Sequence, residues 1–139
     1  MKIIFLFILT LNCLVAQAEN SPCETEETIA KRDVWHAAKL RGISFRAIGQ
    51  EPPLLLEITD GEKILLVTDY GQKSTAYPYV EPKVNHEQRR TVFSVKDQNL
   101  EVIIEGKDCS DIMSGEKFDV SVFITLHGKQ FRGCGRALY

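Results

Sequence analysis

The side-chain types that a serine hydrolase uses occur together near the end of the chain, as Asp111, Ser114 and His127. Such an enzyme commonly exposes its serine in a Gly-x-Ser-x-Gly elbow, and the residues that flank Ser114 do not form one. Ser114-Gly115 is better explained as a turn that enters a strand. We therefore predict no catalytic site here and expect a protein that is not an enzyme.

Cysteine and histidine give no stronger sign of chemistry. A thiol enzyme would pair Cys23 with His36 or His86, but neither pair is accompanied by supporting motif residues. A metal site would add His127, yet the three histidines are scattered singly, without the close paired spacing of zinc modules. Gly133-Cys134-Gly135 has too few glycines, and no following Lys-Ser or Lys-Thr, to hold a phosphate. We predict no metal and no cofactor.

Two polar turns are the expected contact points for a ligand. The first carries Gln50 and Glu51 between Gly49 and Pro52, and the second carries Ser114 and Gly115. The alternative is that Gln50 and Glu51 only cap nearby backbone groups, which is the more common role of such residues in turns.

The clearest strand runs from Phe118 to Leu126, where apolar and polar residues alternate with a period of two. His127-Gly128 then forms a two-residue turn, in which Gly supplies a positive φ at no steric cost. The chain from Lys129 onward would return antiparallel and carry Cys134 back toward Cys109. We therefore predict a Cys109–Cys134 disulfide, which would stabilise the fold by about 3.5 kcal/mol if it closes a loop of about 26 residues.

The remaining elements indicate an all-β fold. A short helix is expected from Thr28 to Leu40, ended by Arg41-Gly42. Further strands are expected at 43–48, 54–59, 63–68, 74–79, 91–95 and 100–105, with a hairpin at Asp60-Gly61 and a surface loop or edge at 84–90. About eight strands at this spacing predict a small antiparallel barrel or barrel-like sheet with one short N-terminal helix and a disulfide.

The start of the sequence is typical of a secretory signal peptide. Lys2 precedes an apolar run from Ile3 to Ala16, and Ala16-Gln17-Ala18 is a small-residue cleavage site. We predict a signal peptide at 1–18, a flexible lead-in at 19–27 and one β domain at 28–139. Export to the periplasm, or secretion beyond it, follows. Asn12 disfavours lipidation at Cys13, so we do not expect a lipoprotein.

Charge and hydropathy exclude two classes of partner. The formal net charge is −2, with no basic cluster that would bind nucleic acid or anionic lipid. No segment after the signal peptide approaches the ~20 apolar residues of a transmembrane helix. Cys23 is left over in an oxidising compartment: it is free, pairs between molecules, or competes with Cys109 or Cys134.

Five segments resemble a family of uncharacterised bacterial exported domains, some of which are joined to META-type or lysozyme-inhibitor-type domains. They are Phe45-Arg-Ala-Ile-Gly-Gln-Glu-Pro52, Leu56-Glu-Ile58, Val67-Thr-Asp-Tyr-Gly71, Cys109-Ser-Asp-Ile-Met-Ser-Gly115 and Gly133-Cys-Gly-Arg-Ala-Leu138. The resemblance covers nearly all of the expected mature chain. It implies an envelope-located β domain, and no activity is settled for the family. We predict a non-enzymatic binding or accessory module of the bacterial envelope, whose partner would be an envelope component or c-type lysozyme.

A second, shorter resemblance concerns Ser114-Gly115-Glu-Lys-Phe118, which is similar to the Ser-Gly-x-x-Tyr signature of inhibitors of c-type lysozyme. In that family the serine and a downstream lysine enter the lysozyme cleft, and Ser114 and Lys129 hold the corresponding places here. Phe118 replaces the tyrosine, and Gln130 follows the lysine instead of Gly. The alternative function is therefore inhibition of c-type lysozyme by Ser114 and Lys129.

Overall fold

The computed structural model describes residues 34–139. Four predictions fall on residues before that range and lie outside the described residues. They are the signal peptide at 1–18, the lead-in at 19–27, the state of Cys23 and the first part of the helix at 28–33.

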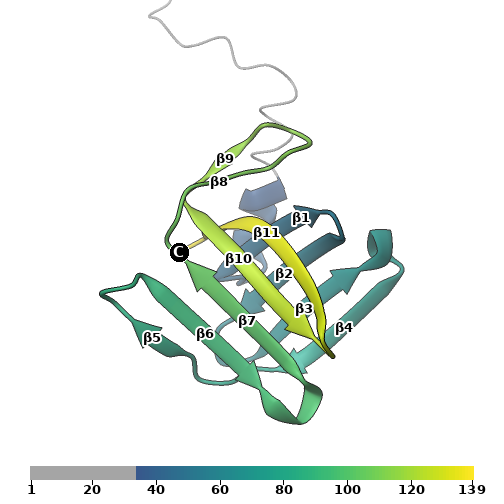
Figure 1. The fold of residues 1–139 in the computed structure, drawn as a ribbon, viewed down its shortest axis with the longest axis vertical. Coiled ribbons are helices and arrows are strands. Elements are labelled where there is room, and N and C mark those ends of the chain that lie inside the picture. The colour runs from purple at the N-terminus through teal and green to yellow at the C-terminus, as the bar shows by residue number, and fades with distance from the viewer. Residues whose placement is uncertain (1–33) are drawn as a thin grey trace, which may run out of the picture.

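A short helix at residues 34–40 is followed by the strands of the domain (Figure 1). The first half of the chain forms β1 (Phe45–Gln50), β2 (Pro53–Thr59), β3 (Lys63–Thr68), the 3-10 turn η1 (Asp69–Gly71), β4 (Lys73–Pro78) and β5 (Lys83–Asn85). The second half forms β6 (Arg90–Val95), the 3-10 turn η2 (Lys96–Gln98), β7 (Leu100–Glu105), β8 (Cys109–Ser110), β9 (Lys117–Phe118), β10 (Val120–Leu126) and β11 (Lys129–Ala137).

Nine strands form one antiparallel sheet in the order β4-β3-β2-β1-β11-β10-β7-β6-β5. The sheet curls into a half-barrel, with β1 to β4 on the right and β6 and β7 on the left in Figure 1. β8 and β9 pair only with each other and lie beyond one end of β10. The predicted barrel-like antiparallel sheet with one short N-terminal helix is confirmed.

Both predicted turns join paired strands. Gly61 has a φ of +72° in the three-residue loop between β2 and β3, whose ends pair as Thr59 with Lys63. His127 and Gly128 have φ values of +47° and +81°, and the strands on either side pair as Leu126 with Lys129. Positive φ at these positions sets the tight reversal that keeps the flanking strands in register.

Alternation along the strands sends one row of side chains to the inner face of the curled sheet. The resulting inner core is almost entirely aliphatic and aromatic, and its most deeply buried members are Leu56, Ile58, Ile64, Val102, Val122 and Ile124. This core comes from strands throughout the domain. Its burial is the main stabilising contribution, at roughly 25 cal/mol per Å² of apolar surface removed from water.

A second group of buried residues, called here the outer cluster, packs on the opposite face of β1 and β11. It consists of Trp35, Ala38, Ile43, Phe118, Cys134 and Leu138, with Ile48 and Cys109 beside it. The Cys109–Cys134 disulfide joins β8 to β11, with Cα atoms 5.5 Å apart, which confirms the predicted pairing. The outer cluster thus fastens the helix and the β8–β9 pair onto the sheet.

The close approach of β1 and β11 depends on glycine. A Cβ on Gly133 would overlap the carbonyl oxygen of Ile48, and one on Gly135 would lie 2.7 Å from the carbonyl oxygen of Arg46. Since real Cβ atoms do not approach backbone oxygens so closely, larger residues at these two positions would push β11 away from β1. β11 is also longer than expected, because it continues to Ala137 as the partner of β1.

Two strands were predicted with the wrong boundaries. The strand expected at 43–48 is β1, which begins and ends two residues later, at Phe45 and Gln50. The expected strand at 118–126 is interrupted at Asp119, so that Phe118 belongs to β9 and only Val120–Leu126 form β10. Phe118 pairs with Cys109 and packs in the outer cluster, 5.6 Å from the Trp35 ring, instead of in the inner core. The segment expected as a loop or edge contains β5, an exposed strand at one edge of the sheet.

Candidate functional site

The loop between β8 and β9 is a closed turn built on Asp111. The Asp111 N–H donates to the Glu116 carbonyl oxygen at 2.9 Å, and the Gly115 N–H donates to the Asp111 carbonyl oxygen at 2.8 Å. The Asp111 carboxylate accepts from the Ser114 N–H at 2.9 Å and from the Ser114 hydroxyl at 2.6 Å. Gly115 has a φ of +70°, which a side chain would strain. The turn is therefore fixed by its own hydrogen bonds.

Asp111 is a buried carboxylate that stays ionised. Burial alone would raise the pKa of Asp111, because it disfavours the charged form. The hydrogen bonds from Ser114, Gln50 and Met113 to the carboxylate outweigh that effect, so the pKa lies below its usual range. The Gln50 bond also ties the β8–β9 loop to the end of β1, which brings together the two turns predicted as contact points.

Ser114 has a structural role in this turn. Its hydroxyl donates to Asp111 and accepts the Glu116 N–H at 3.2 Å. His127 lies in the turn between β10 and β11, at the other end of β10 from the Asp111 loop. The three residue types of a serine hydrolase are therefore not assembled in this structure.

A cleft of about 260 Å³ lies between the β8–β9 loop, the turn after β1 and the outer face of β10 and β11. Its floor combines apolar groups with the disulfide, and its rim carries polar ones: the lining includes Ile48, Gln50, Glu51, Cys109, Ser110, Asp111, Ile112, Ser121, Phe123, Arg132 and Cys134. The Ser121 hydroxyl donates to the Lys107 carbonyl oxygen at 3.2 Å. Apolar clefts with few polar groups are the usual form of binding sites.

Ile112 and Met113 form an exposed apolar tip beside this cleft. Their exposed fractions are 73% and 74%, although both belong to the turn that Asp111 holds rigid. Large apolar side chains that stand exposed on a fixed loop are a common feature of interaction surfaces. Sequence reasoning missed this pair, because nothing in the sequence shows that the loop is rigid.

A second hollow, of about 210 Å³, lies on the other side of Gln50 and Asp111. It is lined by Trp35, Arg46, Ser114 and Glu116 among others, and it borders Val34, the first described residue. Ser114 therefore faces this second hollow, whereas Glu51 lines the first.

Arginine side chains fasten the walls of these hollows. Arg46 and Arg136, partners across β1 and β11, lie 5.4 and 4.8 Å from the Trp35 ring. Arg136 also lies 4.8 Å from the Phe118 ring, and its guanidinium donates to Glu116 at 2.9 Å. These contacts join the helix, the sheet and the β8–β9 loop through cation–π and ionic interactions.

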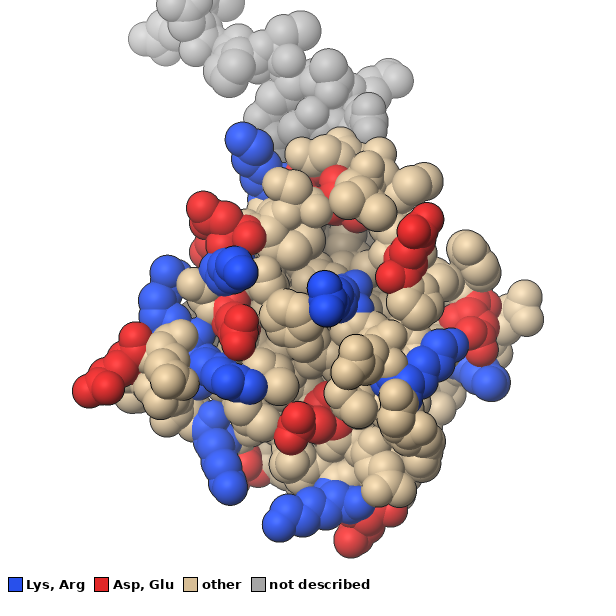
Figure 2. Space-filling model, viewed as in Figure 1, with Lys and Arg blue, Asp and Glu red and all other residues tan. Residues whose placement is uncertain are grey.

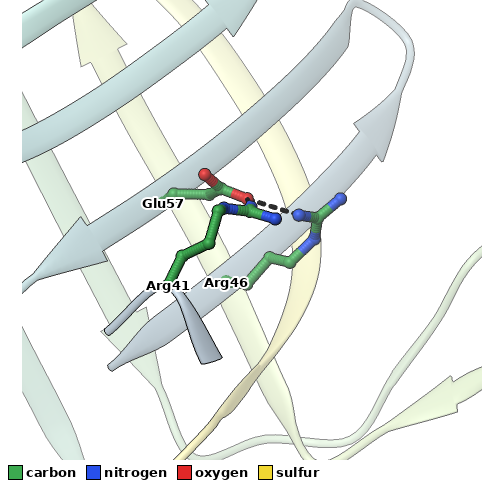
Figure 3. Close-up of polar contacts among 3 residues, drawn as sticks. All are labelled: Arg41, Arg46 and Glu57. Carbon is green, nitrogen blue, oxygen red and sulfur yellow. Dashed lines mark hydrogen bonds and ion pairs between the residues drawn. The ribbon is translucent and has the colours of Figure 1, made fainter. Parts of the chain in front are cut away.

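Glu57 holds Arg46 and Arg41 by ion pairs. Its carboxylate is buried, pairs with Arg46 and accepts from Arg41 at 2.8 Å (Figure 3). Burial lowers the pKa of Arg46, and the charge of Glu57 opposes that effect. Arg46 is thus held in place under Trp35 by a charge that β2 supplies.

Lys129 lies far from the other predicted contact residues. It begins β11, with its Nζ 4.0 Å from the Asp69 carboxylate and 5.0 Å from the Phe131 ring. Arg136, whose guanidinium bonds to Glu116 in the Ser114 loop, follows Lys129 by seven residues, which is about 23 Å along an extended strand. The structure brings together Gln50, Glu51, Ser114 and Gly115 and leaves Lys129 at the opposite end of the sheet (Figure 1).

Residues 34–139 contain no group of three or more His, Cys, Asp or Glu side chains placed to hold a metal ion. None of the helical structure in that range is long and apolar enough to traverse a bilayer. Comparison with known proteins found no match to a family model, a curated protein or a solved structure. The resemblance to exported envelope domains therefore stays a prediction.

Proposed function

We propose that this protein is an exported, non-enzymatic binding module of the cell envelope, whose ligand occupies the cleft beside the disulfide. The observation that carries the proposal is the combination of an apolar floor with a preformed rim. The disulfide fixes β8 against β11, and the Asp111 turn fixes the loop, so little order is lost when a ligand binds.

The signal-peptide pattern at 1–18 supports placing this module outside the cytoplasm, where its disulfide forms readily. The separation of Ser114 from His127 supports binding over hydrolysis, since a nucleophilic serine needs a base within hydrogen-bond reach.

Site-specific photo-crosslinking in the bacterial periplasm tests the proposal. A benzoylphenylalanine at Ile112, on the rim of the cleft, should give a defined adduct that excess unlabelled protein suppresses. The matched control is the same group at Tyr70, which is also highly exposed but lies in η1 at the Lys129 end of the molecule. Equal adducts from both positions, or none from Ile112, would contradict the proposal.

Inhibition of c-type lysozyme is the second candidate, and the rigid, exposed turn at Ser114 favours it. Because Lys129 begins β11 at the end of the sheet away from the β8–β9 loop, the loop would enter the lysozyme cleft without that lysine. In a lysis assay, protection should be lost in Met113→Asp, which changes the loop tip and keeps the Asp111 bonds, and kept in Lys129→Ala. Absence of protection at a large molar excess would remove this candidate.

A further inference from the structure

The cleft continues into a groove across the outer face of the sheet. A neighbouring hollow of about 330 Å³ is lined by Ile103, Glu105, Arg90 and Gln130, and it shares Phe123 and Arg132 with the first cleft. The two hollows therefore meet at one aromatic ring and one guanidinium. Figure 2 shows a mostly uncharged surface over β10 and β11, with the charged side chains gathered mainly toward its margins.

Arg132 is the positive charge at the centre of this groove. Its guanidinium lies 5.5 Å from the Phe123 ring, and none of the ion pairs among residues 34–139 involves it. The acidic residues Glu51 and Glu105 line the two hollows on either side. This arrangement favours a ligand with a single negative charge at its middle and disfavours one that is acidic along its length.

The backbone of Ser110 sets a second requirement for a ligand of this groove. Asp111 donates to Glu116 across β8 and β9, so the adjoining Ser110–Lys117 pair is of the type that exchanges no backbone hydrogen bonds. The N–H and C=O of Ser110 therefore point away from β9, to the side of β8 that has no strand partner among the described residues. A ligand with its own backbone donors and acceptors would satisfy both groups.

We propose that the groove binds an extended polypeptide segment with one acidic side chain that pairs with Arg132 and apolar side chains that rest on Phe123 and the disulfide. This inference rests on the proposed function and adds the class of ligand. The backbone of the segment pairs with that of Ser110. Ile112 covers the end of the groove that lies beside the β8–β9 loop. An extended chain of six to eight residues, about 20 to 26 Å long, would span both hollows.

Oriented peptide libraries test the proposal on the mature, oxidised protein. Three libraries of capped octapeptides, alike except for Asp, Asn or Lys fixed at one central position, are passed over the immobilised protein. The Asp library should be retained most, and the best peptide from it should bind at least tenfold more weakly to Arg132→Gln. Lys73→Gln, which removes an exposed cation on β4 outside the groove, is the matched control and should bind like the native protein.

Methylation of each peptide nitrogen in turn then tests the backbone pairing. Alternate positions should lose affinity, because only every second N–H of an extended strand faces its partner. Equal tolerance at all positions, equal retention of the three libraries, or native affinity in Arg132→Gln would overturn the inference. Those results would leave the proposed function standing if Ile112 still crosslinks in cells, whereas loss of that crosslink removes the proposed function itself.

Discussion

The inner core and the outer cluster bury apolar side chains on opposite faces of the same sheet, but they are built in different ways. The inner core comes from strand alternation, and almost every strand of the large sheet contributes to it. The outer cluster joins residues from Trp35 to Leu138 through a disulfide, arginine–aromatic contacts and a buried glutamate. The comparison teaches that the inner core holds the fold while the outer cluster shapes the cleft beside the disulfide.

The largest expected effect comes from the inner core. Leu56→Ala removes a fully buried side chain and should lower the free energy of unfolding by about 4 kcal/mol, through lost burial and the cavity left behind. Leu55 is a half-buried neighbour on the outer face, and Leu55→Ala should lower the free energy of unfolding much less. Urea denaturation measures both, and equal losses would remove the distinction between the two faces.

Removal of the disulfide should come next. The double variant Cys109→Ser, Cys134→Ser should lower the free energy of unfolding by about 3.5 kcal/mol, because the unfolded chain regains the entropy of a 25-residue separation. If the outer cluster shapes the cleft, the folded variant should also lose the Ile112 crosslink. Retention of a native crosslink in the folded double variant would show that the cleft does not need the disulfide.

Glu57→Gln tests the charge beneath Trp35. Without the carboxylate, the mostly buried guanidinium of Arg46 has no negative charge to pair with. We therefore expect the free energy of unfolding to fall by about 2 kcal/mol. Trp35 is the only tryptophan of the chain, so its fluorescence reports directly on the outer cluster. Glu105→Gln, which breaks a more exposed pair with Arg90, is the control and should change stability little.

The smallest effect should be the pH dependence that Asp111 contributes. Its folded pKa lies below the unfolded value of about 3.9, so its stabilisation is full above that value and is lost as the pH falls through the folded pKa. Asp111→Asn should therefore flatten the fall in unfolding free energy as the pH drops below about 4. An unchanged pH profile would mean that the turn is held by other bonds.

The contrast between the inner core and the outer cluster also explains which features could be predicted from the sequence. The period-two pattern in β7, the apolar run of β3 and the turns at Gly61 and Gly128 are local signals, and they predicted these elements correctly. The disulfide could be predicted because one hairpin returns Cys134 toward Cys109. These features depend on residues close together in the chain.

The site was only partly predictable, because its contacts join distant segments. Gln50 meets Asp111, and Phe118 meets Trp35, only once β1 has paired with β11. No local sequence pattern predicts that pairing. Alternation alone assigned Phe118 to the inner core, whereas it belongs to the outer cluster. The central place of Arg132 depends on the same topology, so it was not singled out from the sequence.

The pairing of β1 with β11 also sets when the molecule can fold. Phe45 lies opposite Ala137, so the middle of the sheet joins two stretches that are 92 residues apart in the chain. Contacts this remote in the chain form slowly. The two halves of the sheet therefore stay apart until β1 and β11 meet, however early the hairpins on either side form.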